Sequence, residues 1–160
     1  MIYRIRERFW SLGDNFTINN ESGEACFQVK GAVFSWGDSL SFQDASGHEL
    51  ALIDQTLLTL MPRYQIMIDG AVVAEVVKEW SWFSKSFTLD VPGPNDYSIE
   101  GSFWEHDFTF NRKGRIVAHV NKHMLSFSDS YGVEIIEGED VVAILCTCVV
   151  IDQILHDGKD

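Results

Sequence analysis

The sequence predicts a mostly β, antiparallel domain whose sheet curves around one hydrophobic helix near the C-terminus. Three observations lead to this prediction. Apolar and polar residues alternate along most of the chain, turn clusters that contain glycine separate the alternating runs, and one long apolar run lies close to the C-terminal end. Strict alternation is typical of strands with one buried and one solvated face, and short spacings between turns make consecutive strands antiparallel neighbours.

The predicted strands and turns follow each other in short succession along the chain. Alternating runs occupy residues 3–9, 16–19, 39–43, 87–91 and 107–111. Turn clusters occupy residues 19–23, 44–47, 69–70 and 111–114. Each cluster places a glycine where a tight hairpin needs a positive φ angle, so each is predicted to join two neighbouring strands.

An internal repeat relates residues 70–91 to residues 114–135 at one offset of 44 residues, without gaps. Identical pairs include Gly70/Gly114, Ala74/Ala118, Val76/Val120, Lys78/Lys122 and Phe83/Phe127. Fainter echoes run over residues 23–30 and 47–55. The repeated unit is a turn, a strand, an aromatic-rich bend and a strand, and a repeated meander tends to close or stack so that its edges are hidden.

The alternation within the repeat predicts which side chains face inward. The inward face is predicted to hold Val72, Ala74, Val76, Ile116, Ala118 and Val120. Glu75 and His119 fall on the opposite face, which we expect to be solvated. Because alanine occupies the middle inward position in both copies, a bulky element is expected to pack against the sheet there.

The C-terminal run Val141–Ile151 is predicted to be a buried helix over about residues 140–156. Its β-branched residues favour a strand by propensity alone. The run is long for a strand, however, the acidic pair at 139–140 precedes it as an N-cap, and Gly158 follows as a C-cap. A helix that is apolar on every face must be surrounded by protein, and a curved sheet would surround it.

Composition limits the class of protein. The 160 residues, 46% of them hydrophobic, are expected to form one domain over residues 1–160 with a packed core. Twelve Lys and Arg against 24 Asp and Glu give a net charge of −12, which argues against a nucleic-acid partner. The sequence shows no apolar signal segment, and its three cysteines suit reduced thiols, so a cytoplasmic protein is expected.

Several loose motifs, in order and spacing, resemble the LURP-one-related family over roughly residues 2–157. They are Tyr3-x-Ile5, Phe27-x-Val-x-Gly31, Asp44-x-x-Gly47-x-x-Leu50, Tyr64-x-Ile66, Gly70-x-x-x-Ala74-x-Val-x-Lys78 and Tyr131-x-Val133. That family is similar in fold to the C-terminal domain of tubby proteins and to phospholipid scramblases. The resemblance implies an antiparallel β-barrel of about twelve strands closed around a central hydrophobic C-terminal helix.

The resemblance implies little about activity. Most bacterial members have no assigned activity, and tubby domains bind phosphoinositide head groups through clustered Lys and Arg. This chain carries no matching basic cluster. Scramblases end in a membrane-inserting segment, and here the C-terminal run is shorter than the roughly 20 apolar residues that a membrane helix needs.

Two groups of basic residues are the candidate sites for an anionic ligand. One is Arg4, Arg6 and Arg8 on one face of the first strand, and the other is Arg112, Lys113 and Arg115 around a hairpin glycine. Arginine suits phosphate or carboxylate recognition. The simpler interpretation, which we favour, is cross-strand pairing with the abundant acids for the first group and solvated turn charges for the second.

An aromatic bend at Trp80, Trp82 and Phe83 is a candidate surface for stacking a ligand or touching a membrane. The repeat places Phe127 at the position equivalent to Phe83. A structural corner of the fold is therefore the favoured interpretation, and contact with a membrane would be peripheral at most.

No metal site, cofactor or catalytic centre is predicted. His119 and His123 have a spacing that brings imidazoles together on a helix, but they lie in a predicted strand, and neighbours such as Glu105, His106 and Asp107 point to opposite faces. Cys146 and Cys148 fall in the predicted buried helix. A site assembled from residues of distant strands would leave no short motif in the sequence.

The predicted function is a non-catalytic cytoplasmic binding or scaffolding domain with an unidentified protein or small-molecule partner. An anionic-lipid or head-group binder using the basic groups is the first alternative. A carrier for a small apolar ligand is the second, although the run over residues 141–151 should already fill the interior. The sequence leaves the oligomeric state open.

Overall fold

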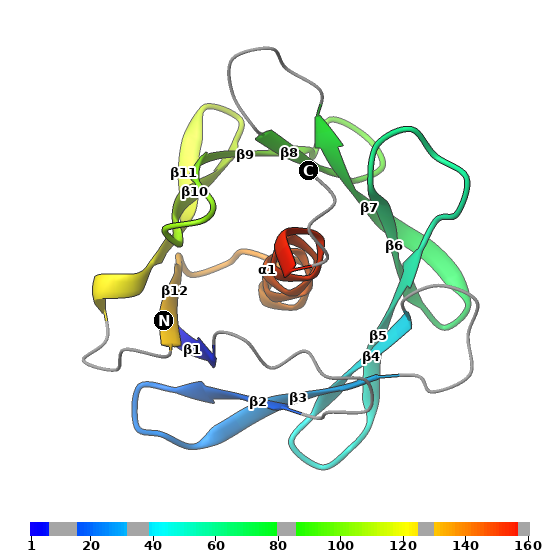
Figure 1. Ribbon diagram of the computed structural model, residues 1–160. Helices are drawn as coiled ribbons and strands as arrows, with labels where there is room; N and C mark the ends of the chain where they lie inside the picture. Colours follow the sequence, from blue (N-terminus) through cyan, green and yellow to red (C-terminus); the bar gives the residue numbers. More distant parts are fainter. Residues whose placement is uncertain (7–15, 32–38, 80–85, 125–129, 157–160) are drawn as a thin grey trace.

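The computed structural model describes residues 1–6, 16–31, 39–79, 86–124 and 130–156. These residues form a closed antiparallel β-barrel with one helix along its interior (Figure 1). The strands are β1 (Ile2–Arg6), β2 (Phe16–Asn20), β3 (Ala25–Gly31), β4 (Ser39–Asp44), β5 (Glu49–Gln55), β6 (Arg63–Ile68), β7 (Ala71–Glu79), β8 (Ser86–Asp90), β9 (Tyr97–Ser102), β10 (Asp107–Arg112), β11 (Arg115–Asn121) and β12 (Ser130–Ile135). A 3₁₀ turn, η1 (Lys122–Met124), follows β11, and α1 (Val141–His156) ends the described chain.

The barrel closes between its first and last strands. Consecutive strands pair antiparallel around the ring, and β12 pairs back onto β1, where Ile2 lies opposite Glu134 and Arg6 opposite Ser130. Closure leaves the sheet without an open edge, which removes the aggregation hazard of unpaired strands. The predicted fold class, with twelve strands around a C-terminal helix, is confirmed.

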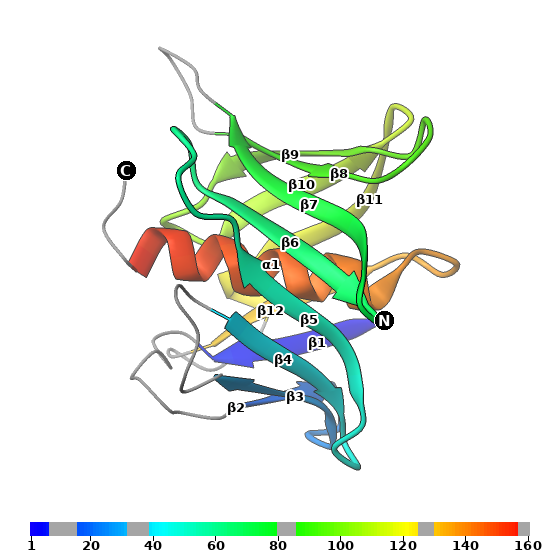
Figure 2. The ribbon, with the colours of Figure 1, turned by 90° about the vertical axis from the view of Figure 1, so that its right-hand side faces the viewer.

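The connections between strands divide into two ends because successive strands run in opposite directions. The tight-turn end holds the connections that leave the even-numbered strands, such as residues 69–70 and 113–114, together with residues 136–140 that lead into α1. The long-loop end holds the connections that leave the odd-numbered strands, including the β5–β6 loop at residues 56–62. Figure 2 shows α1 starting at the tight-turn end, beside the N-terminus, and finishing at the long-loop end.

The internal repeat is a structural repeat. Residues 70–91 become a turn followed by β7 and β8, and residues 114–135 become a turn followed by β11 and β12. In both turns the two central residues have positive φ, at 50° and 79° for Asp69–Gly70 and at 52° and 76° for Lys113–Gly114. That pair of angles is typical of a type I′ hairpin turn, whose twist matches that of the flanking strands.

Four β-bulges follow the same pattern and correct part of the predicted inward face. The register shifts so that an extra residue stands three positions after the turn glycine; these residues are Cys26, Leu50, Val73 and Val117. An extra residue reverses the facing of the residues on one side of it. Val72 and Ile116, predicted to face inward, are therefore 43% and 59% exposed on the outside, whereas Val117 is buried.

Inward alternation holds beyond each bulge. Ala74, Val76, Ala118 and Val120 are all buried, as predicted. Their neighbours on the outer face are polar: Glu75 bonds to Arg63 of β6, and His119 bonds to Asp107 of β10. The expectation of a bulky element against the sheet is confirmed at Ala74, because α1 contacts β7, which carries this residue, as well as β5 and β6.

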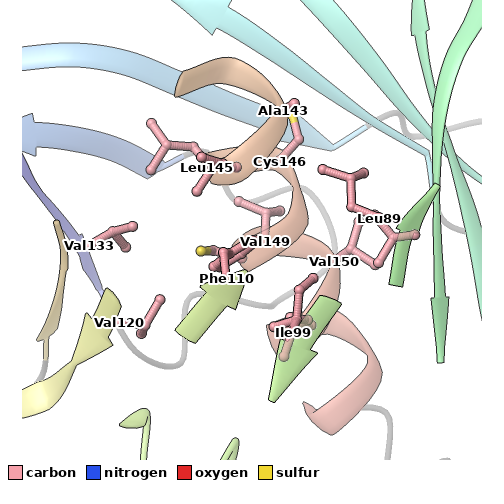
Figure 3. Packing of buried hydrophobic residues seen from close by; sticks show 14 of the residues in the cluster. Leu89, Ile99, Phe110, Val120, Val133, Ala143, Leu145, Cys146, Val149 and Val150 are labelled. Atoms are coloured by element: carbon pink, nitrogen blue, oxygen red, sulfur yellow. The ribbon is translucent and has the colours of Figure 1, made fainter. Parts of the chain in front are cut away.

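Helix α1 fills the barrel interior. The predicted N-cap is confirmed, since the Asp140 carboxylate accepts a hydrogen bond from the Ala143 amide at 3.0 Å. Side chains from Ile144 to Ile151 have essentially no exposed surface. In Figure 3 the labelled residues Leu145, Val149 and Val150 of α1 lie among Leu89, Ile99, Phe110, Val120 and Val133 of the wall. Burial of each such side chain is worth roughly 1.5–3 kcal/mol, which outweighs the strand propensity of the run.

Thr147, a polar side chain inside α1, makes its hydrogen bond within the helix. Thr147 donates its hydroxyl to the Ala143 carbonyl oxygen at 2.7 Å, so it stays satisfied in an apolar interior. No helix among the described residues is long and apolar enough to cross a membrane.

Candidate functional site

The most exposed apolar side chains of the described residues lie in the β5–β6 loop at the long-loop end. Leu58 and Leu60 are fully exposed, and Leu57 is 52% exposed. We call these three residues the leucine tip. The eight residues from Gln55 to Pro62 include no charged side chain. Large apolar groups gathered in water are uncommon on a monomer and are typical of contact sites.

Local hydrogen bonds hold the loop in an ordered shape. The Thr56 amide donates to the Arg63 carbonyl oxygen at 2.9 Å, and the Lys78 amide donates to the Pro62 carbonyl oxygen at 3.1 Å. Within the loop, Thr59 donates its hydroxyl to the Met61 carbonyl oxygen at 2.8 Å. The chain from Gln55 to Pro62 curls around a hollow of about 280 Å³. The leucine side chains are therefore displayed on a fixed support.

The backbone of the leucine tip is strained at one residue. Leu58 has a φ angle of 61°, in the left-handed region. For a bulky residue this region is a genuine outlier, and it costs roughly 1–2 kcal/mol relative to a glycine's freedom. A leucine thus stands where the backbone favours glycine or asparagine, and strain of this kind clusters at functional sites.

A second feature of the long-loop end is a group of buried polar side chains at the mouth of the barrel. We call His106, Tyr131 and Asp152 the mouth cluster. The buried polar residues Lys78 and Gln153 lie at the same end of the barrel. Tyr131 donates its hydroxyl to Asp152 Oδ2, and His106 Nε2 lies 3.1 Å from Asp152 Oδ1. The imidazole stacks on the Tyr131 ring, with centroids 4.4 Å apart and planes 18° apart.

The mouth cluster is suited to anchoring α1. Asp152 belongs to α1, whereas Tyr131 belongs to β12 and His106 to the β9–β10 connection, so the contacts tie the last turns of the helix to the barrel. The Tyr131 side chain is completely buried, and the His106 and Asp152 side chains are 15% and 10% exposed. A buried carboxylate needs such partners, since its charge is costly to bury alone.

A similar anchor lies at the tight-turn end. The Glu139 carboxylate accepts hydrogen bonds from Arg112 Nη2 at 2.6 Å, from Arg112 Nε at 3.1 Å and from the Tyr97 hydroxyl at 2.9 Å. Burial alone would raise the pKa of Glu139, but these hydrogen bonds outweigh burial and hold that pKa below its ordinary value. Burial, followed by the hydrogen bond to Glu139, raises the pKa of Tyr97 to about 12.

Charge is distributed unevenly between the two ends. The described carboxylates in or beside the tight turns are Glu21, Glu24, Asp44, Glu49, Asp69, Asp90, Asp96, Glu137, Glu139 and Asp140. The basic residues at that end are Arg112, Lys113 and Arg115, all of one hairpin. The tight-turn end is therefore acidic, whereas the β5–β6 loop at the opposite end has no charge.

The second group of predicted anion-binding residues, Arg112, Lys113 and Arg115, lies together at one hairpin, and Arg112 already forms an ion pair. Arg112 is bound to Glu139, and this hydrogen bond raises the pKa of Arg112 further. Lys113 is exposed in the turn, and Arg115 lies opposite Arg112. The surroundings of this hairpin are acidic, which disfavours an anionic ligand there.

The other predicted site residues are placed only in part. Arg4 and Arg6 lie on the outer face of β1, because Tyr3 and Ile5, which alternate with them, are buried. Arg8 lies outside the described residues, and so does the aromatic bend of Trp80, Trp82 and Phe83. The proposed roles of these residues stay predictions.

The histidines and cysteines are separated. His119 Nε2 lies 3.0 Å from Asp107 Oδ1 on the outside of the barrel, whereas His106 faces Asp152. Within the described ranges, no three or more His, Cys, Asp or Glu side chains are grouped so that they could hold a metal ion. Cys146 and Cys148 are completely buried in α1, and burial raises the pKa of both thiols, which makes them poor nucleophiles.

Reasoning from the sequence missed both features of the long-loop end. One signal for buried polar groups at this end was present, because Lys78 is in phase with the inward-facing Ala74 and Val76 and is a charge on a buried face. A signal was also present for the leucine tip, since Leu57, Leu58 and Leu60 interrupt the alternation just before Pro62. The contacts of Asp152 with Tyr131 and His106 join distant segments and leave no local pattern.

Comparisons with known proteins agree with this architecture. The sequence profile of the LURP-one-related family matches residues 1–152. The uncharacterised protein YxjI of Bacillus subtilis is 34% identical over 156 residues, which cover 98% of this chain and 94% of that protein. LURP-one-related protein 15 of Arabidopsis thaliana is 25% identical over 174 residues, covering 97% of this chain and 80% of that protein.

A solved structure extends the likeness to three dimensions. An Arabidopsis thaliana protein determined by X-ray crystallography superposes with a TM-score of 0.67 at 18% identity, over 97% of this chain and 91% of that chain. At this identity the likeness concerns the fold. Together, the closed barrel around α1, the profile match over nearly the whole chain and the 34% identity to a full-length relative show that this chain belongs to the LURP-one-related family.

Proposed function

We propose that this chain is a non-catalytic binding module that contacts its partner through the leucine tip. The carrying observation is the pair of fully exposed leucines, Leu58 and Leu60, in a charge-free loop at the long-loop end. The strained backbone of Leu58 supports the same proposal, because leucine is a poor choice for that conformation unless its side chain is used. The three cysteines, all free thiols, favour a cytoplasmic setting.

The interior of the barrel supports binding at the surface over transport of a ligand inside. Helix α1 occupies the space that a small apolar ligand would need, and its side chains from Ile144 to Ile151 are in contact with the wall on every side. The carrier alternative therefore has no observation in its favour.

The buried polar side chains support a structural role over a catalytic one. Tyr131 and Asp152, the groups with the chemistry of an acid–base pair, are enclosed and hold each other. A catalytic pair must reach a substrate. The anionic-ligand alternative at the Arg112 hairpin is weakened by the pairing of Arg112 with Glu139 and by the acidic surroundings.

Site-specific photo-crosslinking tests the proposal. A photoreactive amino acid replaces Leu58 in one variant and Ile116 in the other, and both full-length chains are irradiated in the cells that produce them. Ile116 is a matched control because it is a 59% exposed aliphatic residue at the opposite end. We expect the Leu58 variant to form a discrete covalent product that the Ile116 variant does not form, detected by mass spectrometry.

Two results would contradict the proposal. Equal products from both positions would mean that the leucine tip is not the contact surface. A catalytic turnover that is lost in a folded Asp152→Asn variant would mean that the mouth cluster is an active site and that the module is an enzyme.

A further inference from the structure

We infer that the partner of the leucine tip is a lipid bilayer with little net surface charge, into whose interface the tip inserts. This inference rests on the proposed function, and it adds the chemical class of the partner. Three features favour a bilayer as the partner: the apolar area of the tip, the residues around it and the distribution of charge along the barrel.

The apolar area of the tip is too small for a stable protein–protein interface. Three leucine side chains expose roughly 300 Å² of apolar surface. A stable interface takes about 800 Å² of total surface from each partner, of which roughly 450 Å² is apolar, with a well-packed centre and a polar rim. A bilayer needs no complementary groove, and it accepts a few protruding aliphatic side chains one by one.

The residues that accompany the leucine tip suit the boundary between lipid and water. Thr59, which is exposed, stands between Leu58 and Leu60, and its small hydroxyl tolerates the head-group region. Trp104, 59% exposed, lies in the β9–β10 connection at the same end of the barrel. Tryptophan is enriched at membrane interfaces because its ring is apolar and its N–H is polar. Figure 2 shows both connections at the end where α1 finishes.

The charge distribution of the protein indicates how the barrel is oriented on the membrane and which surface charge of the membrane it prefers. With the tip in the interface, the acidic tight-turn end points into water, and a strand of six or seven residues places it about 20 Å away. That distance exceeds the Debye length of about 8 Å at physiological ionic strength. Arg63 at the base of the loop is paired with Glu75 at 2.9 Å, so it adds little attraction for anionic lipids.

A chain with a net charge of −12 is repelled by an anionic surface, and the repulsion grows as salt is removed. At low ionic strength, where the Debye length reaches about 30 Å at 0.01 M, binding should therefore be strongest on zwitterionic lipid and weaker when anionic lipid is added. The opposite dependence is expected of a protein that recognises anionic head groups through basic residues. The dependence of binding on anionic lipid thus distinguishes insertion of the leucine tip from recognition of anionic head groups.

The expected affinity is modest. Insertion of a few leucine side chains compares with a single myristoyl chain, whose partition coefficient is on the order of 10⁴ M⁻¹. Half of the protein should then be bound at about 0.1 mM accessible lipid. Binding is reversible, and a second signal would be required for permanent attachment.

Flotation with phosphatidylcholine vesicles tests the inference on the full chain. We expect the wild-type protein to float with the vesicles, and the double variant Leu58→Ser, Leu60→Ser to bind at least about tenfold more weakly. The control is Val72→Ser, Ile116→Ser, which removes two exposed aliphatic residues at the opposite end and should bind like the wild type. Circular dichroism confirms that all three proteins are folded.

Each alternative result overturns the inference in a distinct way. Absence of wild-type flotation at millimolar phosphatidylcholine, or equal flotation of the tip variant, excludes insertion of the leucine tip. Flotation that needs phosphatidylserine and is lost in Arg4→Ala, Arg6→Ala instead indicates an anionic head-group site. If flotation fails while the photoreactive residue at position 58 still captures a protein, the lipid partner is wrong and the proposed function stands; if both fail, both are wrong.

Discussion

At each end of α1, a carboxylate of low exposure accepts a hydrogen bond from a tyrosine of the barrel wall. At the tight-turn end this pair is Glu139 with Tyr97, and at the long-loop end it is Asp152 with Tyr131. The third partner differs, because a guanidinium completes the first anchor and an imidazole the second. The fold therefore fixes its internal helix at two points by related chemistry.

Outside these anchors the described parts of the two ends differ in the length of their connections and in their charge. The tight-turn end has short glycine turns, two of them with the angles of type I′ hairpins, and a concentration of carboxylates. The long-loop end carries the charge-free β5–β6 loop with its exposed leucines. The tight turns at one end mainly specify strand pairing, and their charges favour solubility. The longer connections at the long-loop end are less constrained by strand pairing and can form a contact surface.

The largest effect on stability is expected from breaking the tight-turn anchor. Arg112→Ala leaves the Glu139 carboxylate, 7% exposed, without its guanidinium, and a buried charge that loses its partner is strongly destabilising. We expect the thermal midpoint at neutral pH to fall by roughly 8 °C. Differential scanning calorimetry measures the change. A loss below about 2 °C would mean that the pair contributes no more than an exposed ion pair.

The same variant predicts a pH dependence. The folded-state pKa of Glu139 is lowered, so the stability that this carboxylate contributes is present above its ordinary value of 4.5 and is lost as the pH falls through the folded-state value. In Arg112→Ala the carboxylate is protonated more easily. The gap between variant and wild type should therefore shrink as the pH falls from 7 toward 4, and a gap that widens instead would contradict this assignment.

A smaller effect is expected from removing one hydroxyl at the long-loop end. Tyr131→Phe takes a hydrogen bond from Asp152 inside the mouth cluster, where Tyr131 is completely buried, and should lower the thermal midpoint by roughly 4 °C. Tyr97→Phe is the matched change at the other end. It should cost less, because Glu139 keeps two hydrogen bonds from Arg112. Equal losses would show that the two anchors do not differ in this way.

Much of the fold could be predicted because alternation, turn glycines and the 44-residue repeat are local patterns. The bulges could not be predicted from alternation alone, since one added residue reverses the facing of Val72 and Ile116 without changing the composition of the strand. Their shared position, three residues after a turn glycine, becomes visible only when four strands are compared. The echoes at residues 23–30 and 47–55 belong to this same series.

The candidate site was harder to predict than the fold. The anchor at Asp152 joins residues that are 21 and 46 positions apart in sequence, and no short motif marks such a contact. The basic groups were predicted as candidate sites because charge can be read directly from a sequence. In the structure, however, Arg112 forms an ion pair with Glu139. Three leucines in a loop are visible too, but only exposure distinguishes a contact surface from core.

The smallest expected change in stability comes from replacing a leucine of the leucine tip by glycine. This change tests backbone strain separately from contact with a partner. Leu58→Gly relieves a left-handed conformation, with φ at 61°, and should raise the thermal midpoint by roughly 2 °C. Leu60→Gly, whose backbone has no positive φ, should lower the midpoint slightly, because glycine adds entropy to the unfolded chain.

Both glycine variants remove one exposed leucine, so both should float less with phosphatidylcholine vesicles than the wild type. Leu58→Gly then gains stability while it loses binding, which is the combination expected where a strained residue serves a contact. If Leu58→Gly were instead less stable than Leu60→Gly, the left-handed leucine would not be a source of strain. Exposure of the Leu58 side chain would then be the remaining observation that favours contact with a partner.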